Sequence, residues 1–208
     1  MLSVELFGQS LALPDFPERR DVKGLGMSDW NGYAVPLATK LNYQNTYYHA
    51  EPRLDITSID QALDSQFDFV ISTEVFEHVP QPISRAFGNV YKLLKPGGVL
   101  IFTAPYTLTG KTVEHFPEIH DYQVTDEGGQ YVLMNTTKAG VTQVFDHLIF
   151  HGGPGATLEM RLFSESSLID EFKQAGFHNL KTWKAPCFEY GIYAPDDWSL
   201  PMSVRRPK

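Results

Sequence analysis

The chain has almost no cysteine, no surplus of basic residues and no long apolar run. Cys187 is the only cysteine among the 208 residues, so no internal disulfide can form. A chain without disulfides is typical of a reducing compartment, and we expect a cytoplasmic protein. Cys187 stands between Pro186 and Phe188, an apolar setting that favours packing over a nucleophilic role.

The balance of charge is acidic. The chain carries 17 Lys and Arg against 25 Asp and Glu, for a formal net charge of −8. Binding to a phosphate backbone needs clustered Lys and Arg, so we expect no nucleic-acid partner. The one basic cluster, at residues 205–208, is interpreted as a frayed tail.

No stretch approaches the roughly 20 apolar residues of a membrane span, and we expect no membrane partner. The N-terminus also lacks the basic region of a signal peptide. The oligomeric state is left open by the sequence.

Strand and helix patterns alternate along the chain, which favours an α/β fold with a parallel sheet. We expect a single domain over residues 1–208, with a core of residues 20–106 and 164–194. The polar stretch 107–163 is expected to be an insertion that contains an antiparallel pair of strands, residues 130–134 and 141–150. The remaining predicted strands are 21–28, 45–50, 67–73, 98–104, 179–183 and 188–193, and the predicted helices are 31–41, 82–94 and 164–175.

The most informative stretch runs from Phe67 to Tyr106. Its first seven residues, FDFVIST, form an apolar run typical of a strand buried on both faces. The chain turns polar where this strand ends, at Thr73, Glu74, Glu77 and His78. Ligands of open parallel sheets bind outside the carboxyl ends of the strands, so these residues predict a site at that rim.

Three motifs accompany this stretch. They are FDFVI followed by EVFEHV at 67–79, LLKPGGVLI at 93–101, and DIT at 55–57. With them the chain resembles the class I S-adenosylmethionine-dependent methyltransferases, in particular a type 11-like variant linked to sugar and glycan modification. The resemblance implies a Rossmann-like, doubly wound, mostly parallel sheet of the seven-stranded type, with a β-hairpin insertion on its carboxyl rim.

The glycine-rich loop departs from the family pattern. Gly26 keeps one glycine, Ser28 and Trp30 stand where the family has glycines, and Gly24 stands where it has an acid. Glycines there let backbone N–H groups approach a bound ligand closely. A second alignment places this segment at the family's second strand, in which case the glycine loop is missing and the chain is a fragment.

The resemblance implies S-adenosyl-L-methionine as the cofactor. It assigns Gly24, Gly26 and Ser28 to the loop that holds it. Glu51 is the candidate for the ribose hydroxyls, since a carboxylate accepts two such donors well; the alternative is a solvated turn glutamate before Pro52. The adenine is assigned to Asp55 and Ile56, and the methionine side to Thr73 and Glu74.

Three histidines are the catalytic candidates: His78, His115 and His120. A histidine with a pKa near neutrality can take a proton from an acceptor hydroxyl, while His78 could equally fix its turn by hydrogen bonds. The segment 114–122 is expected to bring His115, Glu118, His120 and Asp121 together. His147 and His151 are expected to share one face of a strand without making a site.

No H-E-x-x-H or C-x-x-C pattern occurs, so we expect no metal site. The predicted function is methyl transfer to a hydroxyl or amine of a small molecule or glycan. The alternative is a degenerate methyltransferase fold that serves as a non-catalytic binding module, and the altered glycine loop is its main support.

Overall fold

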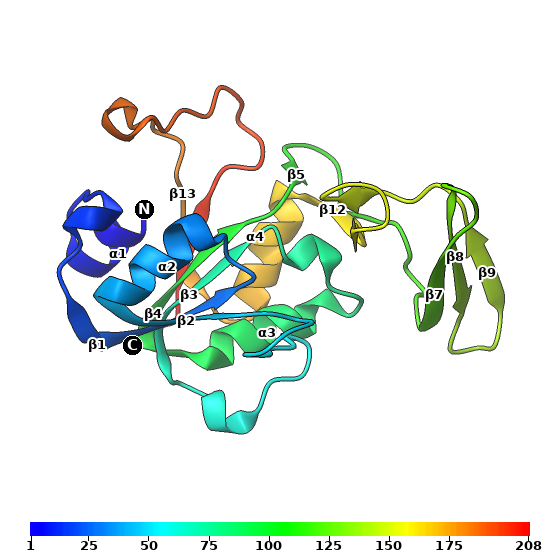
Figure 1. The fold of residues 1–208 in the computed structure, drawn as a ribbon, viewed down its shortest axis with the longest axis horizontal. Coiled ribbons are helices and arrows are strands. Elements are labelled where there is room, and N and C mark those ends of the chain that lie inside the picture. The colour runs from blue at the N-terminus through cyan, green and yellow to red at the C-terminus, as the bar shows by residue number, and fades with distance from the viewer.

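The computed structural model describes all residues, 1–208, and its centre is a six-stranded sheet with the order β13-β14-β4-β3-β1-β2 (Figure 1). The strands are β1 (Arg19–Met27), β2 (Leu41–Thr46), β3 (Phe67–Thr73), β4 (Leu94–Thr103), β13 (His178–Thr182) and β14 (Met202–Arg205). The first four strands are parallel, and β14 runs antiparallel between β4 and β13. The mostly parallel α/β sheet is therefore as expected, but it has six strands and not seven.

Helices cover both faces of this sheet, so the core has three layers. The helices are α1 (Leu2–Phe7), α2 (Asn31–Lys40), α3 (Ile83–Leu93) and α4 (Glu165–Gln174). Alternate residues of β3 point to opposite faces: Phe69 packs in the same cluster as Leu37 of α2, whereas Val70 packs with Phe87 of α3 and Phe172 of α4. Burial on both faces is the reason that β3 reads as a continuous apolar run.

The helices begin and end close to the predicted residues. The side chain of Ser164 accepts a hydrogen bond from the backbone N–H of Ser167, which caps the first turn of α4. Gly176 follows this helix with a φ of 98°, a conformation that favours glycine. None of the helices has the length and apolarity needed to cross a bilayer.

Two strand predictions were wrong, and one strand was missed. The second strand is Leu41–Thr46 and not 45–50, because the buried-exposed alternation begins at Leu41. Residues Phe188–Tyr190 form a short 3-10 turn instead of a strand. The last strand is β14, which lies beyond residue 194, where the expected core ended.

The basic C-terminus is not frayed. Arg205 lies in β14, and its guanidinium donates to the carboxylate of Glu5 at 2.6 Å. Arg206 donates to the backbone carbonyls of Tyr91, Lys92 and Leu94, where α3 ends. The tail therefore satisfies carbonyls that the helix itself leaves without a donor.

The insertion is richer in strands than expected. It contains β5 (Tyr106–Thr107), β6 (Val113–Glu114), β7 (Asp121–Asp126), β8 (Tyr131–Thr136), β9 (Thr142–Phe145), β10 (Phe150–His151), β11 (Thr157–Leu158) and β12 (Arg161–Ser164). The expected antiparallel pair is β8 with β9, and β7 adds a third strand to it. This three-stranded sheet projects from the main body (Figure 1), so the insertion is more than one β-hairpin.

Arg206→Ala is expected to lower the free energy of unfolding by about 2 kcal/mol. The substitution removes the guanidinium donor from the carbonyls at the end of α3, of which that of Lys92 keeps the amide of Ser65, and it removes the guanidinium from the ring of Tyr91, 4.8 Å away. Urea unfolding measures the change. Lys208→Ala, at the exposed end of the same tail, is the control, and unfolding midpoints that coincide in all three proteins would contradict the capping role.

Candidate active site at the carboxyl rim

The carboxyl ends of β1, β2 and β3 meet at one rim of the sheet. Met27 is paired with Thr46 of β2 and with Ser72 of β3, so the residues that follow these strands are neighbours. Two non-glycine residues at this rim have a positive φ: Ser28 at 58° and Glu74 at 53°. Such backbone costs on the order of 1 kcal/mol and concentrates at functional sites. Ser28 thus takes the left-handed conformation that a glycine would hold easily.

A buried carboxylate lies behind Ser28. Asp29 is only 4% exposed; its side chain accepts a hydrogen bond from the hydroxyl of Tyr43 and faces Thr73 Oγ1 at 3.4 Å. Its backbone is fixed by Asn45, which accepts from the Asp29 amide at 2.9 Å and donates to the carbonyl at 2.8 Å. Burial raises the pKa of Asp29 to about 6, and the hydroxyl groups of Tyr43, Tyr33 and Thr73 oppose that rise.

Asp29 was not predicted from the sequence. The signal that could have identified it is that the acid expected at Gly24 is lacking there, whereas an acid is present further along the same loop. A Cβ at Gly26 would collide with the hydroxyl of Tyr43 and the carboxylate of Asp29, so this glycine makes room for their contact. Gly24 lies inside β1, and a Cβ there would collide with the ring of Phe69. Gly24 therefore packs closely against Phe69 inside the sheet, away from the rim.

The side chain of Trp30 is not packed inside the loop. Its side chain is 75% exposed, and its ring lies against Gly32, where a Cβ would collide with it. The absence of a side chain at Gly32 therefore lets the indole lie across the start of α2.

The chain after β2 surrounds a cavity of about 380 Å³. It is lined by Tyr48, His49, Ala50, Glu51 and Arg53. The Oε2 atom of Glu51 accepts from the amide of Arg53 at 2.9 Å, and Oε1 makes no hydrogen bond. The predicted ribose residue thus lies exposed at a cavity with one oxygen free.

Asp55 and Ile56 follow this cavity in the chain. The Oδ1 atom of Asp55 accepts from the amide and the hydroxyl of Thr57, which closes a local turn, and Oδ2 makes no hydrogen bond. The side chain of Ile56 is buried in the main core, and its carbonyl accepts from Asn89 at 2.8 Å. Of the two adenine candidates, Asp55 therefore has the freer side chain.

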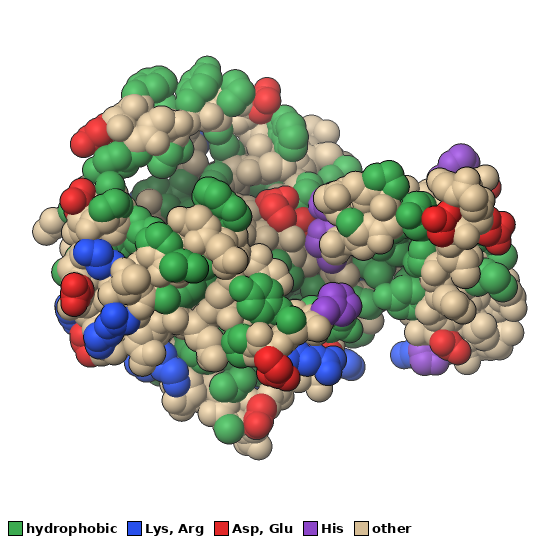
Figure 2. Space-filling model, in the orientation of Figure 1, with side chains coloured by type: hydrophobic (Ala, Val, Ile, Leu, Met, Phe, Trp, Pro, Cys, Tyr) green, Lys and Arg blue, Asp and Glu red, His purple; other side chains and the backbone are tan.

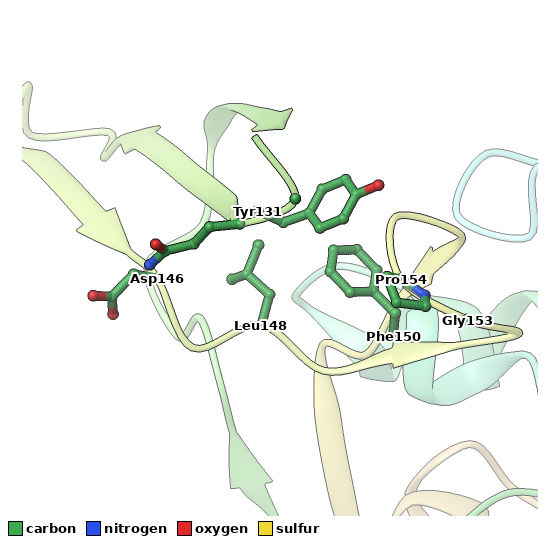
Figure 3. Close-up of a pocket in the computed structure, with 8 residues that line it drawn as sticks. Tyr131, Asp146, Leu148, Phe150, Gly153 and Pro154 are labelled. Carbon is green, nitrogen blue, oxygen red and sulfur yellow. The ribbon is translucent and has the colours of Figure 1, made fainter. Parts of the chain in front are cut away.

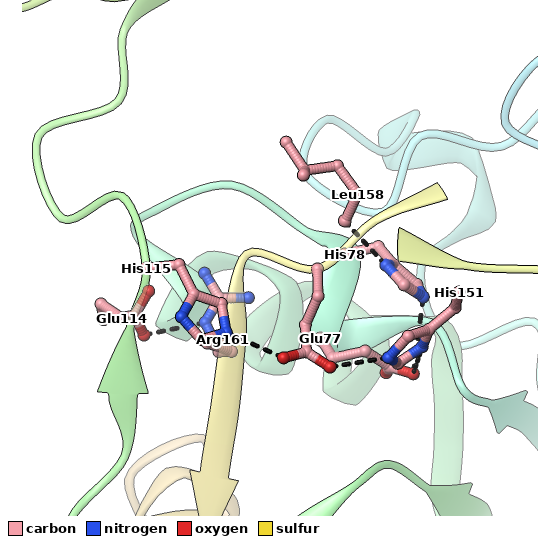
Figure 4. A network of polar contacts seen from close by, with 8 residues as sticks. Glu77, His78, Glu114, His115, His151, Leu158 and Arg161 are labelled. Atoms are coloured by element: carbon pink, nitrogen blue, oxygen red, sulfur yellow. Dashed lines mark hydrogen bonds and ion pairs between the residues drawn. The ribbon is translucent and has the colours of Figure 1, made fainter. Parts of the chain in front are cut away.

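A second polar cluster surrounds the turn Phe76–His78 (Figure 4). Glu77 is 0% exposed, yet neither of its carboxylate oxygens has a hydrogen-bond partner. Its Oε1 lies 3.6 Å from His78 Nε2 and 3.6 Å from His151 Nδ1. Burial raises the pKa of Glu77 to about 8; the nearby Glu74 and Glu159 add to this rise and Arg161 opposes it.

In both histidines, the ring nitrogen that points away from Glu77 is hydrogen-bonded to a residue of the insertion. His78 Nδ1 lies 2.8 Å from the carbonyl of Leu158, and His151 Nε2 lies 2.6 Å from Glu159 Oε2. The other oxygen of Glu159 bonds His115 Nε2 at 2.8 Å. Carbonyl and carboxylate oxygens can only accept, so the bonded nitrogens donate. Burial also lowers the pKa of His78, which favours the neutral ring.

Strand β12 anchors the insertion to this turn. The side chain of Arg161 is fully buried; it donates to the carbonyl of Phe76 at 2.7 Å and to Glu114 at 2.8 Å. The amide of Met160 donates to the carbonyl of Glu77 at 2.8 Å. These bonds place the insertion's polar side chains directly over the motif that follows β3.

The three histidines predicted to be catalytic do not lie together in the structure. His78 and His115 belong to the cluster, whereas His120 is exposed on the projecting sheet, where its amide donates to Asn135. Glu118 bonds Gln143 at 2.8 Å, so the segment 114–122 does not form one cluster as expected. Histidine side chains gather where the insertion meets the main body (Figure 2).

His151 and Glu159 were missed by the sequence analysis. Strand β10 pairs with β11 and turns His151 back towards Glu77, whereas His147 is fully exposed. His147 lies before β10 and His151 within it, so the two histidines do not share one face of a strand as expected. Nothing in the spacing of the sequence indicated this approach, because it depends on how the insertion folds back.

A separate cavity of about 350 Å³ lies within the insertion (Figure 3). Tyr131, Leu148 and Phe150 line it, and Asp146 is its only charged side chain. The rings of Tyr131 and Phe150 meet edge to face, with centroids 5.2 Å apart. This cavity does not bring several polar groups together, so the rim is the better candidate for chemistry.

Comparison with known proteins points to one family. Residues 17–182 match the family described as "Methyltransferase domain", and no curated protein matches the chain. A S-adenosylmethionine-dependent methyltransferase from Clostridium acetobutylicum has a similar structure (TM-score 0.52, 13% identity, covering 100% of this chain and 97% of that one).

Two other similar structures are those of enzymes named for small-molecule or sugar substrates. One is the sugar N-methyltransferase KedS8 from a Streptoalloteichus species (TM-score 0.52, 13% identity, 90% and 81% covered). The other is 1,6-didemethyltoxoflavin-N1-methyltransferase from Burkholderia thailandensis with bound S-adenosylhomocysteine (TM-score 0.51, 15% identity, 93% and 72% covered). At these identities the likeness shows a shared fold.

The buried Asp29 predicts a specific pH dependence of stability. Its folded-state pKa of about 6 lies above the ordinary 3.8. Between these values the folded chain holds this proton more tightly, so the contribution of Asp29 to stability falls as the pH rises from about 4 to about 6 and then levels off. A shift of this size corresponds to at most about 3 kcal/mol.

Asp29→Asn is therefore expected to remove this fall and to be more stable than the wild type at pH 7.5. Urea unfolding of both proteins from pH 4.5 to 7.5 measures the difference. Asp121→Asn, on the exposed strand β7, is the matched control. A wild-type and Asp29→Asn difference that stays constant with pH would contradict the buried, proton-holding carboxyl.

Proposed function

The chain belongs to the methyltransferase domain family, and from this premise we propose that it binds S-adenosylmethionine at the carboxyl rim of its sheet and transfers the methyl group to a hydroxyl or amine of a small molecule or glycan. The observation that carries the proposal is the common rim of β1, β2 and β3, which bears Ser28, Asp29 and Thr73, with Glu51 in the loop that follows β2. In open α/β sheets, ligands bind outside this edge.

The residues at the rim fit the chemistry of the cofactor. The free oxygen of Glu51, beside a cavity, suits the two ribose hydroxyls. The buried carboxylate of Asp29, with the hydroxyl of Thr73, suits the ammonium of the methionine end. Asp55 has a free Oδ2 for the adenine amino group, and Ile56 stays a candidate for packing beside it. Glu74, exposed at the end of β3, completes the methionine side.

The glycine loop fits in an altered form. Ser28 holds the left-handed backbone that a family glycine would provide, and Gly26 makes room for Asp29. Asp29 then supplies the carboxylate that is lacking at Gly24. Strand β1 lies between β2 and β3, which favours the alignment of this segment with the family's first strand over its second.

The cofactor, when bound, supplies an electrophilic methyl group on a sulfonium. The chain must hold the acceptor in line with it, since alignment supplies most of the rate in such a displacement. An acceptor hydroxyl also loses a proton. His115 is suited to take it at Nδ1, because Nδ1 makes no hydrogen bond and Glu159 holds Nε2 at 2.8 Å. The carboxylate then stabilises the charged ring.

The acceptor class rests on two features. The Asp55-Ile-Thr57 motif resembles the variant linked to glycans, and KedS8, of similar fold, is a sugar methyltransferase.

The second candidate function is a non-catalytic binding module, and the observation that favours it is the departure at Gly24 and Trp30 from the family loop. Cofactor binding separates the two candidates.

Isothermal titration calorimetry tests cofactor binding. We expect S-adenosylmethionine and S-adenosylhomocysteine to bind one to one. Glu51→Ala and Asp29→Asn should each weaken binding about tenfold, because each removes a hydrogen bond to a charged or hydroxyl group. Glu127→Ala, in the exposed hairpin between β7 and β8, is the control. If neither compound produces heat or raises the melting temperature at millimolar concentration, the enzyme proposal fails and the binding module is favoured.

Turnover tests the catalytic role of His115. A panel of sugars and small hydroxyl or amine compounds, screened for release of S-adenosylhomocysteine, provides an acceptor. His115→Ala should then lower kcat about 100-fold and change the Kd of the cofactor less than about twofold. His147→Ala, fully exposed on the same insertion, should keep the wild-type kcat. A His115→Ala variant with unchanged kcat would exclude His115 as the base.

A further inference from the structure

We propose that Glu77, His78 and His151 bind a divalent transition-metal ion, and that zinc is the ion that their donor atoms fit best. The site lies beside the predicted cofactor rim but uses different side chains. Two ligands come from the turn after β3 and the third from β10 of the insertion. The site would join the two parts of the chain through one ion.

The three donor atoms converge at distances that suit an ion. One atom from each residue lies within 4.8 Å of the other two. Glu77 Oε1 is 3.6 Å from both His78 Nε2 and His151 Nδ1, too far for hydrogen bonds. Ligands at 2.0–2.1 Å from a tetrahedral zinc ion lie about 3.3 Å from each other. A small contraction of the three side chains would therefore produce the geometry of a metal site.

The buried carboxyl of Glu77 is a second and independent observation. It is 0% exposed, and both of its oxygens lack a partner. A buried acid without any donor costs several kcal/mol if it is charged, and it costs its missing hydrogen bonds even if it is neutral. Arg161 is close by, but its Nε and Nη1 atoms are held by Glu114 and Phe76, and its Nη2 atom, which has no partner either, does not bond Glu77. An ion between Glu77 and the two imidazoles would satisfy this carboxyl.

The outer contacts orient both imidazoles for coordination. His78 donates from Nδ1 to the carbonyl of Leu158, and His151 donates from Nε2 to Glu159. In the neutral rings, the remaining nitrogens then carry lone pairs, and these are the two nitrogens that face Glu77. A carbonyl or carboxylate behind each ligating histidine is the usual arrangement in metal sites.

The donor set selects among ions. Two imidazole nitrogens and one carboxylate oxygen suit zinc and its neighbours in the first transition row, whereas magnesium and calcium prefer oxygen ligands only. Three protein ligands leave one position of a tetrahedral ion for water or substrate. If the proposed function holds, an acceptor hydroxyl in that position would lose its proton more easily; this consequence rests on the proposed function, but the metal site does not.

No metal was expected from the sequence, because the chain has no short-spaced ligand motif. The structure supplies the third ligand from a distant segment. The order of residues along the chain therefore could not indicate this set, and the clustered side chains revise that expectation.

Metal binding by the full chain, without a polyhistidine tag, is the direct test. After the chain has been stripped with a chelator, reloaded with zinc and dialysed, we expect one zinc per chain by mass spectrometry of the metal content. Cobalt should bind at the same site, with the visible absorption bands of a four-coordinate ion. His151→Ala, Glu77→Gln and His78→Ala should each weaken zinc binding about 100-fold or more, and Glu159→Gln, behind His151, about tenfold. Magnesium should not displace zinc.

His147→Ala is the matched control, because this histidine lies on the same segment but is fully exposed. It should bind zinc as the wild type does. His151 is partly exposed, so His151→Ala tests the site even where Glu77→Gln lowers stability; circular dichroism melting identifies unfolded variants. Failure of the wild type to retain zinc, or equal retention by His151→Ala and the wild type, would overturn the proposal. Cofactor titration of the zinc-free protein is measured separately, so loss of the metal site and loss of the proposed function are distinguishable.

Discussion

The contact between the turn Phe76–His78 and strand β12 is the interaction on which the rest of the site depends. The carbonyls of Phe76 and Glu77 accept from Arg161 and Met160, and His78 donates to Leu158. This contact fixes the insertion against the end of β3. It also buries Glu77 and brings His115, His151 and Glu159 to the same edge, so the site is formed by two parts of the chain that are separate in sequence.

The same contact carries an energetic cost. The carboxyl of Glu77 is enclosed without a donor, and burial raises its pKa to about 8. Asp29, at the end of β1, is also buried, with a pKa raised to about 6, although hydroxyl groups surround it. Carboxyl groups whose pKa values are perturbed in this way concentrate at functional sites. Burial of the carboxyl groups of Glu77 and Asp29 lowers the stability of the fold, and a bound cation or cofactor can offset this cost.

Much of the fold could be predicted from the sequence, because its signals are local. The apolar run of β3 and the cap at Ser164 each act within a few residues. β14 could not be predicted, since Met202–Arg205 becomes a strand by pairing with β4 and β13. The sheet β7-β8-β9 has exposed strand faces with weak apolar alternation, so only part of it was visible in the sequence.

The position of the candidate residues could be predicted where a motif follows a strand end, as at Ser28, Thr73, Glu74 and His78. It could not be predicted where the insertion folds back over the rim. Asp29 was hidden because burial, and not residue type, distinguishes it from other loop acids. His151 and Glu159 become significant only once β10, β11 and β12 are in place. Their contacts are tertiary, and no spacing along the chain encodes them.

A crystal structure of the chain with S-adenosylhomocysteine tests the central claim most directly. The account predicts the ribose hydroxyls at Glu51 and the methionine ammonium near Asp29 and Thr73, across the ends of β1, β2 and β3. S-adenosylhomocysteine in the cavity between Tyr131 and Phe150, with the rim empty, would contradict it.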